Sequence, residues 1–124
     1  MASYTQSSQE IALRVDADAI QFNLETAIPL GLIINEAVTN TLKHGFKNKT
    51  EGILQITIEL SENEFYKMTI EDNGLGFPKD FNFKKSKSLG TKLIKNLISQ
   101  LEGNVSIERA TPGAILNFKF KQIG

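Results

Sequence analysis

The chain contains no cysteine, one histidine and no excess of either charge. Without cysteine it can form neither a disulfide nor a thiolate zinc site, which fits a cytoplasmic protein. Its 14 Lys and Arg residues balance 14 Asp and Glu residues, so the formal net charge is zero. This balance argues against a general nucleic-acid or membrane-surface binder. The longest apolar run, Leu30–Ile34, is far too short to span a bilayer.

The N-terminus is the least informative part of the chain. It begins with the polar stretch Met1–Ser8, which lacks the apolar core of a signal peptide. We therefore expect residues 1–10 to be disordered or to be the artificial start of an expressed fragment. Residues 11–124 are expected to form one domain, because 124 residues with 40% apolar content can fill a single core.

Hydrophobic periodicity predicts two kinds of element. Alternating apolar residues predict strands over residues 11–15, 20–22, 53–60, 65–71, 105–109 and 115–120. Apolar residues at three- and four-residue steps predict helices over Leu24–Gly45 and Ser88–Glu102. This order favours a two-layer α+β sandwich, in which one sheet of about five strands carries both helices on one face.

The first predicted helix has two chemically different faces. Its apolar face is expected to carry Ala27, Gly31, Ile34, Val38 and Thr41. Its opposite face is expected to carry Glu36, Asn40 and Lys43, with Leu32 and Ile33 beside them. A carboxylate, an amide and an ammonium group therefore lie in a row on one side of this helix.

The stretch Asp72–Gly76 ends a predicted strand and reads Asp-Asn-Gly-Leu-Gly. Glycines let the backbone turn and let a flat ligand approach closely. A carboxylate at a strand end, beside bare backbone, can accept a hydrogen bond from a ligand amine. A hairpin turn is the alternative, although no partner strand follows at once. The pattern alone leaves ligand binding and a simple turn open.

The second predicted helix begins at Ser88-Leu89-Gly90, where free amides and the helix dipole favour an anion. An amide and a lysine on one helix, facing the start of another, suit a metal-bound polyphosphate. An amide oxygen is a reasonable magnesium ligand, because magnesium keeps waters and takes few protein ligands. Asn40, Lys43 and this helix start are therefore candidates for one polyphosphate site.

Three segments together resemble the GHKL ATP-binding superfamily, which has the Bergerat fold with a mixed sheet. Asn35–His44 resembles its N-box, Asp72–Gly76 its G1 box and Ser88–Ile94 its G2 box. The resemblance runs from about Ile11 to Phe120. In detail the chain is most similar to the catalytic ATP-binding (HATPase_c) domain of a bacterial sensor histidine kinase, of the HisKA_2-like subgroup.

The resemblance implies a role for each matching residue. Asp72 would bind the adenine amine, Asn40 would coordinate Mg²⁺ and Lys43 would meet phosphate oxygens. Glu36 would serve catalysis by positioning, in preference to abstracting a proton. Phe77–Ser88 would form a lid that is mobile until nucleotide binds. The full set of expected ATP-binding residues is Asn40, Lys43, His44, Asp72, Gly74, Gly76, Phe77, Lys87, Ser88, Leu89, Gly90 and Thr91.

Two residues depart from the family pattern. Thr91 stands where Leu is usual, and Ala114 stands where Thr is usual in the turn before the last strand. The second departure removes a hydroxyl contact near the nucleotide, which Thr111 or a water molecule would have to replace.

The resemblance implies a kinase that uses ATP and Mg²⁺ and transfers the γ-phosphate to a histidine on a dimerisation domain outside this chain. His44, the only histidine, lies in the N-box at a helix end and is interpreted as a capping or packing residue, not the phosphoacceptor. An anti-sigma-factor serine kinase of the same fold and a gyrase-like ATPase are the alternatives.

The partners expected from the same resemblance are ATP, the phosphoacceptor domain and a downstream response regulator. Nucleic acid and direct membrane contact are not expected. The domain alone is expected to be a cytoplasmic monomer, even where the parent protein is membrane-anchored.

Overall fold

The computed structural model describes residues 2–6, 9–17, 20–45, 51–74, 88–109 and 113–124. Its strands form a six-stranded mixed sheet in the order β1-β2-β3-β4-β6-β5. β2 and β3 run parallel, and the other neighbouring strands run antiparallel. The strands are β1 (Ala2–Gln6), β2 (Gln9–Ala17), β3 (Glu51–Leu60), β4 (Phe65–Asp72), β5 (Asn104–Arg109) and β6 (Ala114–Lys121).

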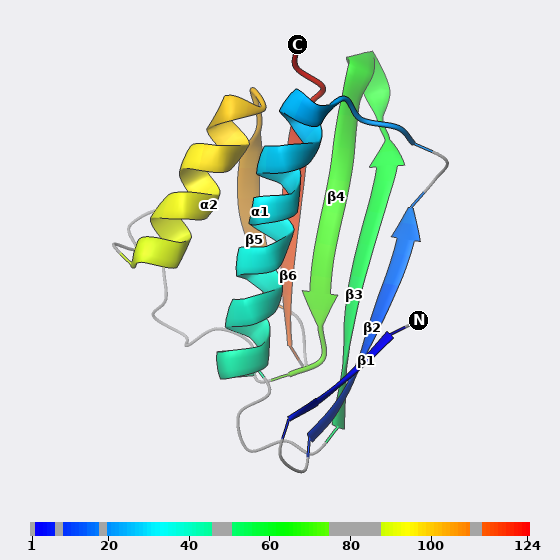
Figure 1. Ribbon diagram of the computed structural model, residues 1–124, viewed down its shortest axis with the longest axis vertical. Helices are drawn as coiled ribbons and strands as arrows, with labels where there is room; N and C mark the ends of the chain where they lie inside the picture. The colour runs from blue at the N-terminus through cyan, green and yellow to red at the C-terminus, as the bar shows by residue number, and fades with distance from the viewer. Residues whose placement is uncertain (1, 7–8, 18–19, 46–50, 75–87, 110–112) are drawn as a thin grey trace.

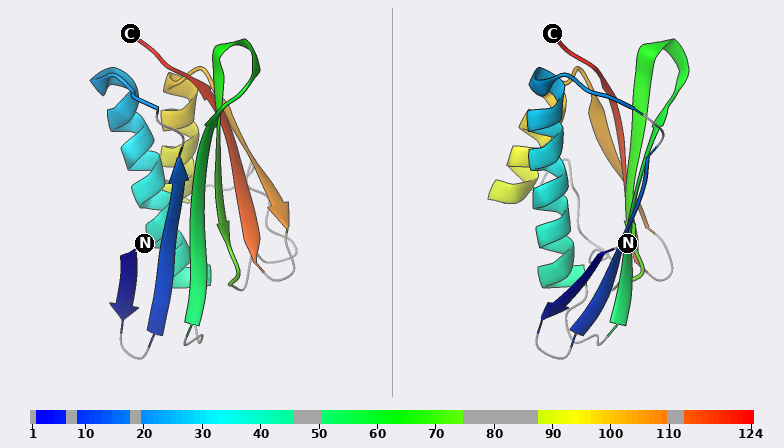
Figure 2. Two further views of the ribbon diagram at one scale, coloured as in Figure 1. Left: turned by 90° about the vertical axis from the view of Figure 1, so that its right-hand side faces the viewer. Right: turned by 45° about the vertical axis from the view of Figure 1, so that its right-hand side comes forward.

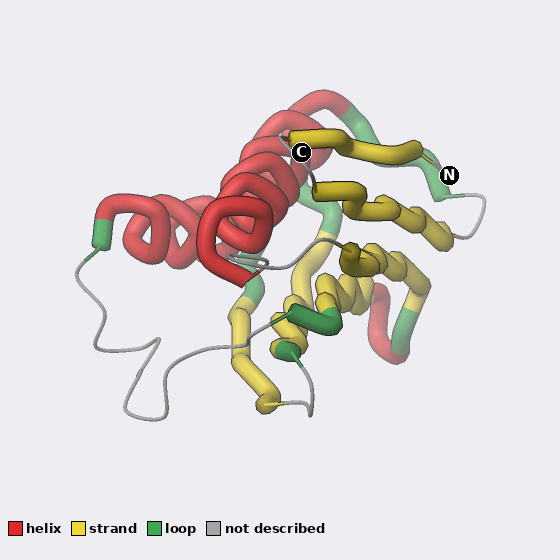
Figure 3. The backbone as a smooth tube through the Cα atoms, turned by 90° about the horizontal axis from the view of Figure 1, so that it is seen from below, coloured by secondary structure: helices red, strands yellow, loops and turns green. Residues whose placement is uncertain are grey.

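The two α-helices of the described residues, α1 (Leu24–Asn40) and α2 (Leu89–Gln100), cover one face of the sheet (Figures 1 and 2). Seen from below, both helices lie on the same side of the strands (Figure 3). This arrangement confirms the predicted two-layer α+β fold. No helix within the described ranges is long and apolar enough to cross a membrane.

The N-terminal part of the fold differs from the prediction in two places. Ala2–Gln6, expected to be irregular, forms β1 and pairs with β2, so the sheet has six strands instead of about five. Residues 20–22, expected to be a short strand, have no regular structure. The ring of Phe22 packs instead against Tyr66 and Phe120, at centroid distances of 5.0 and 5.8 Å. Aromatic packing against β4 and β6, instead of strand pairing, therefore fixes the position of this segment.

α1 begins at a cap that the sequence analysis did not single out. Asn23 Oδ1 accepts a hydrogen bond from the backbone N–H of Thr26 at 3.0 Å. The predicted helix reaches Gly45, and its last turn in the structure, η1 (Thr41–Gly45), is a π-helix. Single π turns occur often at functional sites, because the extra residue per turn changes the direction of the side chains.

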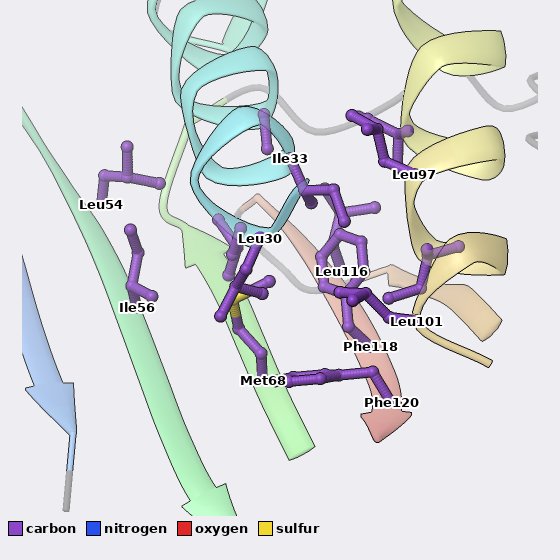
Figure 4. Packing of buried hydrophobic residues seen from close by; sticks show 14 residues of the cluster. Leu30, Ile33, Leu54, Ile56, Met68, Leu97, Leu101, Leu116, Phe118 and Phe120 are labelled. Carbon is purple, nitrogen blue, oxygen red and sulfur yellow. The ribbon is translucent and has the colours of Figure 1, made fainter. Parts of the chain in front are cut away.

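α1 buries a face that is rotated from the predicted one. Leu30, Ile33 and Ala37 are buried, whereas Gly31 is exposed. The apolar run Leu30–Ile34 surrounds the helix, so periodicity does not distinguish the two faces there. Burying Ile33 in place of Gly31 removes more apolar surface from water. The sheet side of this core consists of Leu54, Ile56, Met68, Ile70, Leu116, Phe118 and Phe120 (Figure 4).

α2 buries Ile94, Leu97 and Ile98, as its apolar periodicity predicts. The same periodicity includes Leu89 and Leu93, which are exposed, so the buried stripe covers only the later turns of the helix. The helix ends near the predicted position, Glu102. Glu102 takes the left-handed conformation, with φ of 53°, and its N–H donates to Ser99 O at 3.0 Å. Gly103 is required for a different reason, because a side chain there would collide with the backbone oxygen of Lys119.

The start of α1 is fastened to the end of the chain. The Thr26 hydroxyl is fully buried, donates to Ile123 O at 3.2 Å and accepts from Ile123 N at 2.9 Å. Asn23 Nδ2 also donates to Ile123 O, at 2.6 Å. These bonds fix one end of the helix against the segment that follows β6, and so fix where the other end lies.

Candidate functional site

The predicted site residues come from three elements. Glu36 and Asn40 lie in the second half of α1, Asp72 is the last residue of β4, and Ser88 caps α2. α1 and β4 both end at the same end of the molecule, with α2 beside α1 (Figure 1). The fold therefore brings together side chains that are far apart in the sequence.

Glu36 and Asn40 form the part of the site that α1 contributes. They lie one turn apart, both half-buried, and Asn40 Nδ2 donates to Glu36 Oε1 at 3.4 Å. The helix rotation that buries Ile33 and Ala37 leaves both polar side chains directed at α2. Their predicted proximity is confirmed, although Ile33, expected beside them, belongs to the core.

Gly90 is the point at which α2 meets this pair. A side chain at Gly90 would collide with the Glu36 carboxylate, and its Cβ would lie 3.1 Å from Asn40 Nδ2. Both clashing groups are the ends of flexible side chains, so a larger residue at Gly90 would displace the Glu36 and Asn40 side chains from their positions. The contact also places a carboxylate and an amide against the first turn of α2.

The first turn of α2 has a complete side-chain cap. Ser88 Oγ accepts from the backbone N–H of Thr91 at 3.2 Å and donates to Thr91 Oγ1 at 2.7 Å. The Thr91 side chain is buried, whereas that of Leu89 is 84% exposed. The amides of Leu89 and Gly90 belong to the first turn and have no acceptor within the helix, so they favour an anion.

Asp72 lies in a partly apolar environment at the end of β4. Its cross-strand neighbours, Leu54 and Ala114, are both buried. Desolvation raises the pKa of Asp72 above its ordinary value of 3.8, and a hydrogen bond from the backbone N–H of Gly74 to Oδ1, 2.8 Å long, opposes that rise. A half-buried carboxylate of this kind can recognise a neutral donor such as an aromatic amine.

Two residues that the sequence analysis passed over fix the backbone around Asp72. Asn73 Oδ1 accepts from the backbone N–H of Ile53 at 2.8 Å, and Asn73 N donates to Ile53 O at 3.3 Å. Gly113 has φ of 106°, and a side chain there would collide with the backbone oxygen of Asp72. An Asn after a strand-ending Asp, and a Gly before the last strand, were the available sequence signals.

The other predicted residues divide into two groups. Lys43 is exposed in η1, and Gly74 is buried just after β4. Gly76, Phe77, Lys87 and the side chain of His44 lie outside the described residues, as does almost all of the predicted lid.

A metal ion would have few protein ligands here. Within the described ranges, no three His, Cys, Asp or Glu side chains gather closely enough to hold one. Asn40 turns Nδ2 toward Glu36 Oε1, which leaves Oδ1 as the amide's ligand atom, and one such oxygen fits a cation that keeps most of its waters and takes phosphate oxygens, which is the behaviour of Mg²⁺.

Comparison with known proteins finds a matching family and several relatives. Residues 25–123 match the family of histidine kinase-, DNA gyrase B- and HSP90-like ATPases. The chain is 31% identical over 107 residues to blue-light-activated histidine kinase 2 of Erythrobacter litoralis, covering 86% of this chain and 31% of that protein. It is 36% identical over 78 residues to an anti-sigma F factor of Clostridium botulinum, covering 58% of this chain and 52% of that protein.

A solved structure is similar over most of the fold. The histidine kinase domain of a blue-light-activated kinase from Erythrobacter litoralis superimposes with a TM-score of 0.82 at 29% identity, over 90% of this chain and 52% of that one. The chain spans about a third of the length of its blue-light relative. By the extent of the family match and the agreement of the fold, the chain belongs to the histidine kinase-, DNA gyrase B- and HSP90-like ATPase family.

Proposed function

We propose that this chain is the ATP-binding catalytic domain of a two-component sensor histidine kinase. It transfers the γ-phosphate of ATP to a histidine on a dimerisation domain outside this chain, from which a response regulator receives it. The observation that carries the proposal is the contact of Glu36 and Asn40 with Gly90 at the start of α2, at the same end of the fold as Asp72.

Each residue has a role that follows from its surroundings. Asp72 accepts a hydrogen bond from the adenine amine, because its carboxylate is half-buried beside apolar neighbours. Asn40 presents an amide oxygen to Mg²⁺, which when bound neutralises the phosphates and orients them for transfer. The amides of Leu89 and Gly90 receive phosphate oxygens. Lys43 is exposed and adds charge attraction at the mouth of the site.

The domain supplies positioning and charge stabilisation, and the acceptor must come from elsewhere. Phosphoryl transfer needs near in-line placement of acceptor and phosphate. His44 lies in η1, which follows directly on α1 and Asn40, so its backbone is fixed beside the residues proposed to hold the phosphates and keeps it from that in-line position. We therefore propose a cytoplasmic domain that is monomeric in isolation and binds nucleotide without labelling itself.

Incubation with γ-labelled ATP and Mg²⁺ tests this function, with and without a separately supplied histidine phosphoacceptor domain. We expect acid-labile label on the added domain alone. Acid-labile label on this chain alone would contradict the proposal and return His44 as the acceptor.

The similarity to an anti-sigma F factor makes a serine kinase the second candidate. The same assay distinguishes the two, because phosphoserine survives acid whereas phosphohistidine does not. Acid-stable label on an added protein substrate would favour the serine kinase.

A further inference from the structure

The Glu36 carboxylate lies beside the start of α2, at which the phosphates are proposed to bind. It is directed at Gly90, in the first turn of α2, and Asn40 is its hydrogen-bonding neighbour. The start of a helix carries partial positive charge, so a carboxylate stabilises it as a phosphate would. The proposed phosphate site therefore contains an anionic side chain of its own.

Building on the nucleotide-binding function above, we propose that Glu36 is a specificity-determining residue that makes the site select metal-bound over metal-free polyphosphate. A free polyphosphate must bring its charge beside the Glu36 carboxylate and compete with it for the first turn of α2. A divalent cation held by the Asn40 amide oxygen would be attracted to the same carboxylate, which lies one helical turn away. Glu36 thus opposes one form of the ligand and supports the other.

The half-buried position of Glu36 determines how strongly its carboxylate repels a metal-free polyphosphate. Two like charges a few ångströms apart repel weakly in bulk water and several times more strongly near a protein surface, where the effective dielectric constant is lower. We expect the carboxylate to weaken metal-free binding roughly tenfold, within the range for a charge at a helix end or beside another charge.

The test uses Glu36→Gln, which removes the charge and keeps the shape of the side chain and an acceptor for Asn40. Glu59→Gln, an exposed change on β3, is the matched control. The dissociation constant of ADP is measured by titration calorimetry in saturating Mg²⁺ and again in EDTA, for both variants and the unchanged protein. We expect Glu36→Gln to bind ADP about tenfold more tightly in EDTA and nearly unchanged in Mg²⁺. Glu59→Gln should change neither value.

A purely structural role would give a different result. If Glu36 only supports the contact between α1 and α2, Glu36→Gln weakens ADP binding equally in Mg²⁺ and in EDTA, and this outcome overturns the proposal. An unchanged ratio of the two dissociation constants also overturns it. Glu36→Ala serves as a second charge-removing variant, and its ratio must shift in the same direction.

The failure of this inference can be distinguished from the failure of the proposed function. If the unchanged protein shows no ADP binding in Mg²⁺, the nucleotide site itself is wrong. If it binds ADP and the charge-removing variants leave its magnesium dependence intact, only the role of Glu36 is wrong.

Discussion

Replacement of Asp72 by Asn should affect nucleotide binding and the stability of the fold in different directions. In the unchanged protein, Gly74 N donates to Asp72 Oδ1 at 2.8 Å. Asp72→Asn removes the charge and keeps a side-chain oxygen that can accept the same hydrogen bond. A hydrogen bond from the adenine amine to a charged acceptor contributes about 1.5–3 kcal/mol. Its loss should weaken nucleotide binding by roughly 10- to 150-fold.

The effect of the same change on stability has the opposite direction. Desolvation raises the pKa of Asp72 in the folded protein, so the folded state holds this proton more tightly than the unfolded chain does. The stability that this group contributes is therefore present below the ordinary carboxyl pKa and is lost as pH rises through the raised pKa. At neutral pH the ionised carboxylate destabilises the fold, and Asp72→Asn should leave the urea midpoint equal or higher.

The assay pairs calorimetric titration with Mg-ADP and urea denaturation at neutral pH, with the exposed Asp16→Asn as control. Asp72→Asn should also remove the fall in ADP affinity that protonation of Asp72 causes on acidification. Unchanged ADP affinity in Asp72→Asn would refute the adenine contact. A large drop in the urea midpoint would show that the carboxylate serves the fold instead.

Four further predictions concern other parts of the chain. Asn40→Ala should lose ADP affinity in Mg²⁺ and change little in EDTA, and equal losses in both would exclude the metal role. Thr26→Val leaves the part-buried backbone N–H of Ile123 without its acceptor and should lower the free energy of unfolding by about 1–3 kcal/mol, whereas an unchanged urea midpoint would contradict the anchoring of α1 to the segment after β6. Glu102→Gly should raise stability by about 1 kcal/mol, because glycine adopts its left-handed conformation without strain. Gly103→Ala should lower stability because its side chain would collide with the backbone of Lys119 in β6. Thermal unfolding measures the effect of both substitutions.

Local patterns in the sequence were sufficient to predict most of the elements and the site segments. Strand alternation depends on neighbouring residues alone, and it predicted β4 to within a residue, because inner residues such as Met68 and Ile70 alternate with polar ones. The Asp72 and Ser88 segments each combine a turn or cap with glycine over a few positions. Such signals are readable without knowledge of the rest of the fold.

The parts that could not be predicted depend on contacts between distant residues. Thr26 meets Ile123 across 97 positions, and Asn73 meets Ile53 across 20. Nothing near either residue in the sequence indicates its partner. Phe22 likewise sits in a segment that alternates as a strand does, and its aromatic contacts with β4 and β6 override that local preference.

The rotation of α1 shows why the core and the site cannot be assigned separately. Glu36 follows the buried Ile33 by three residues, and Asn40 follows the buried Ala37 by three. Three residues turn a helix through about 300°, which is about 60° less than a full turn. Each polar side chain is therefore offset from its buried neighbour by the same angle, and both lie on the same side of the buried stripe. That side is where Gly90 brings α2 into contact. Burial of Ile33 and Ala37 thus directs Glu36 and Asn40 at α2, and the packing that stabilises the domain also sets the geometry of the proposed phosphate site.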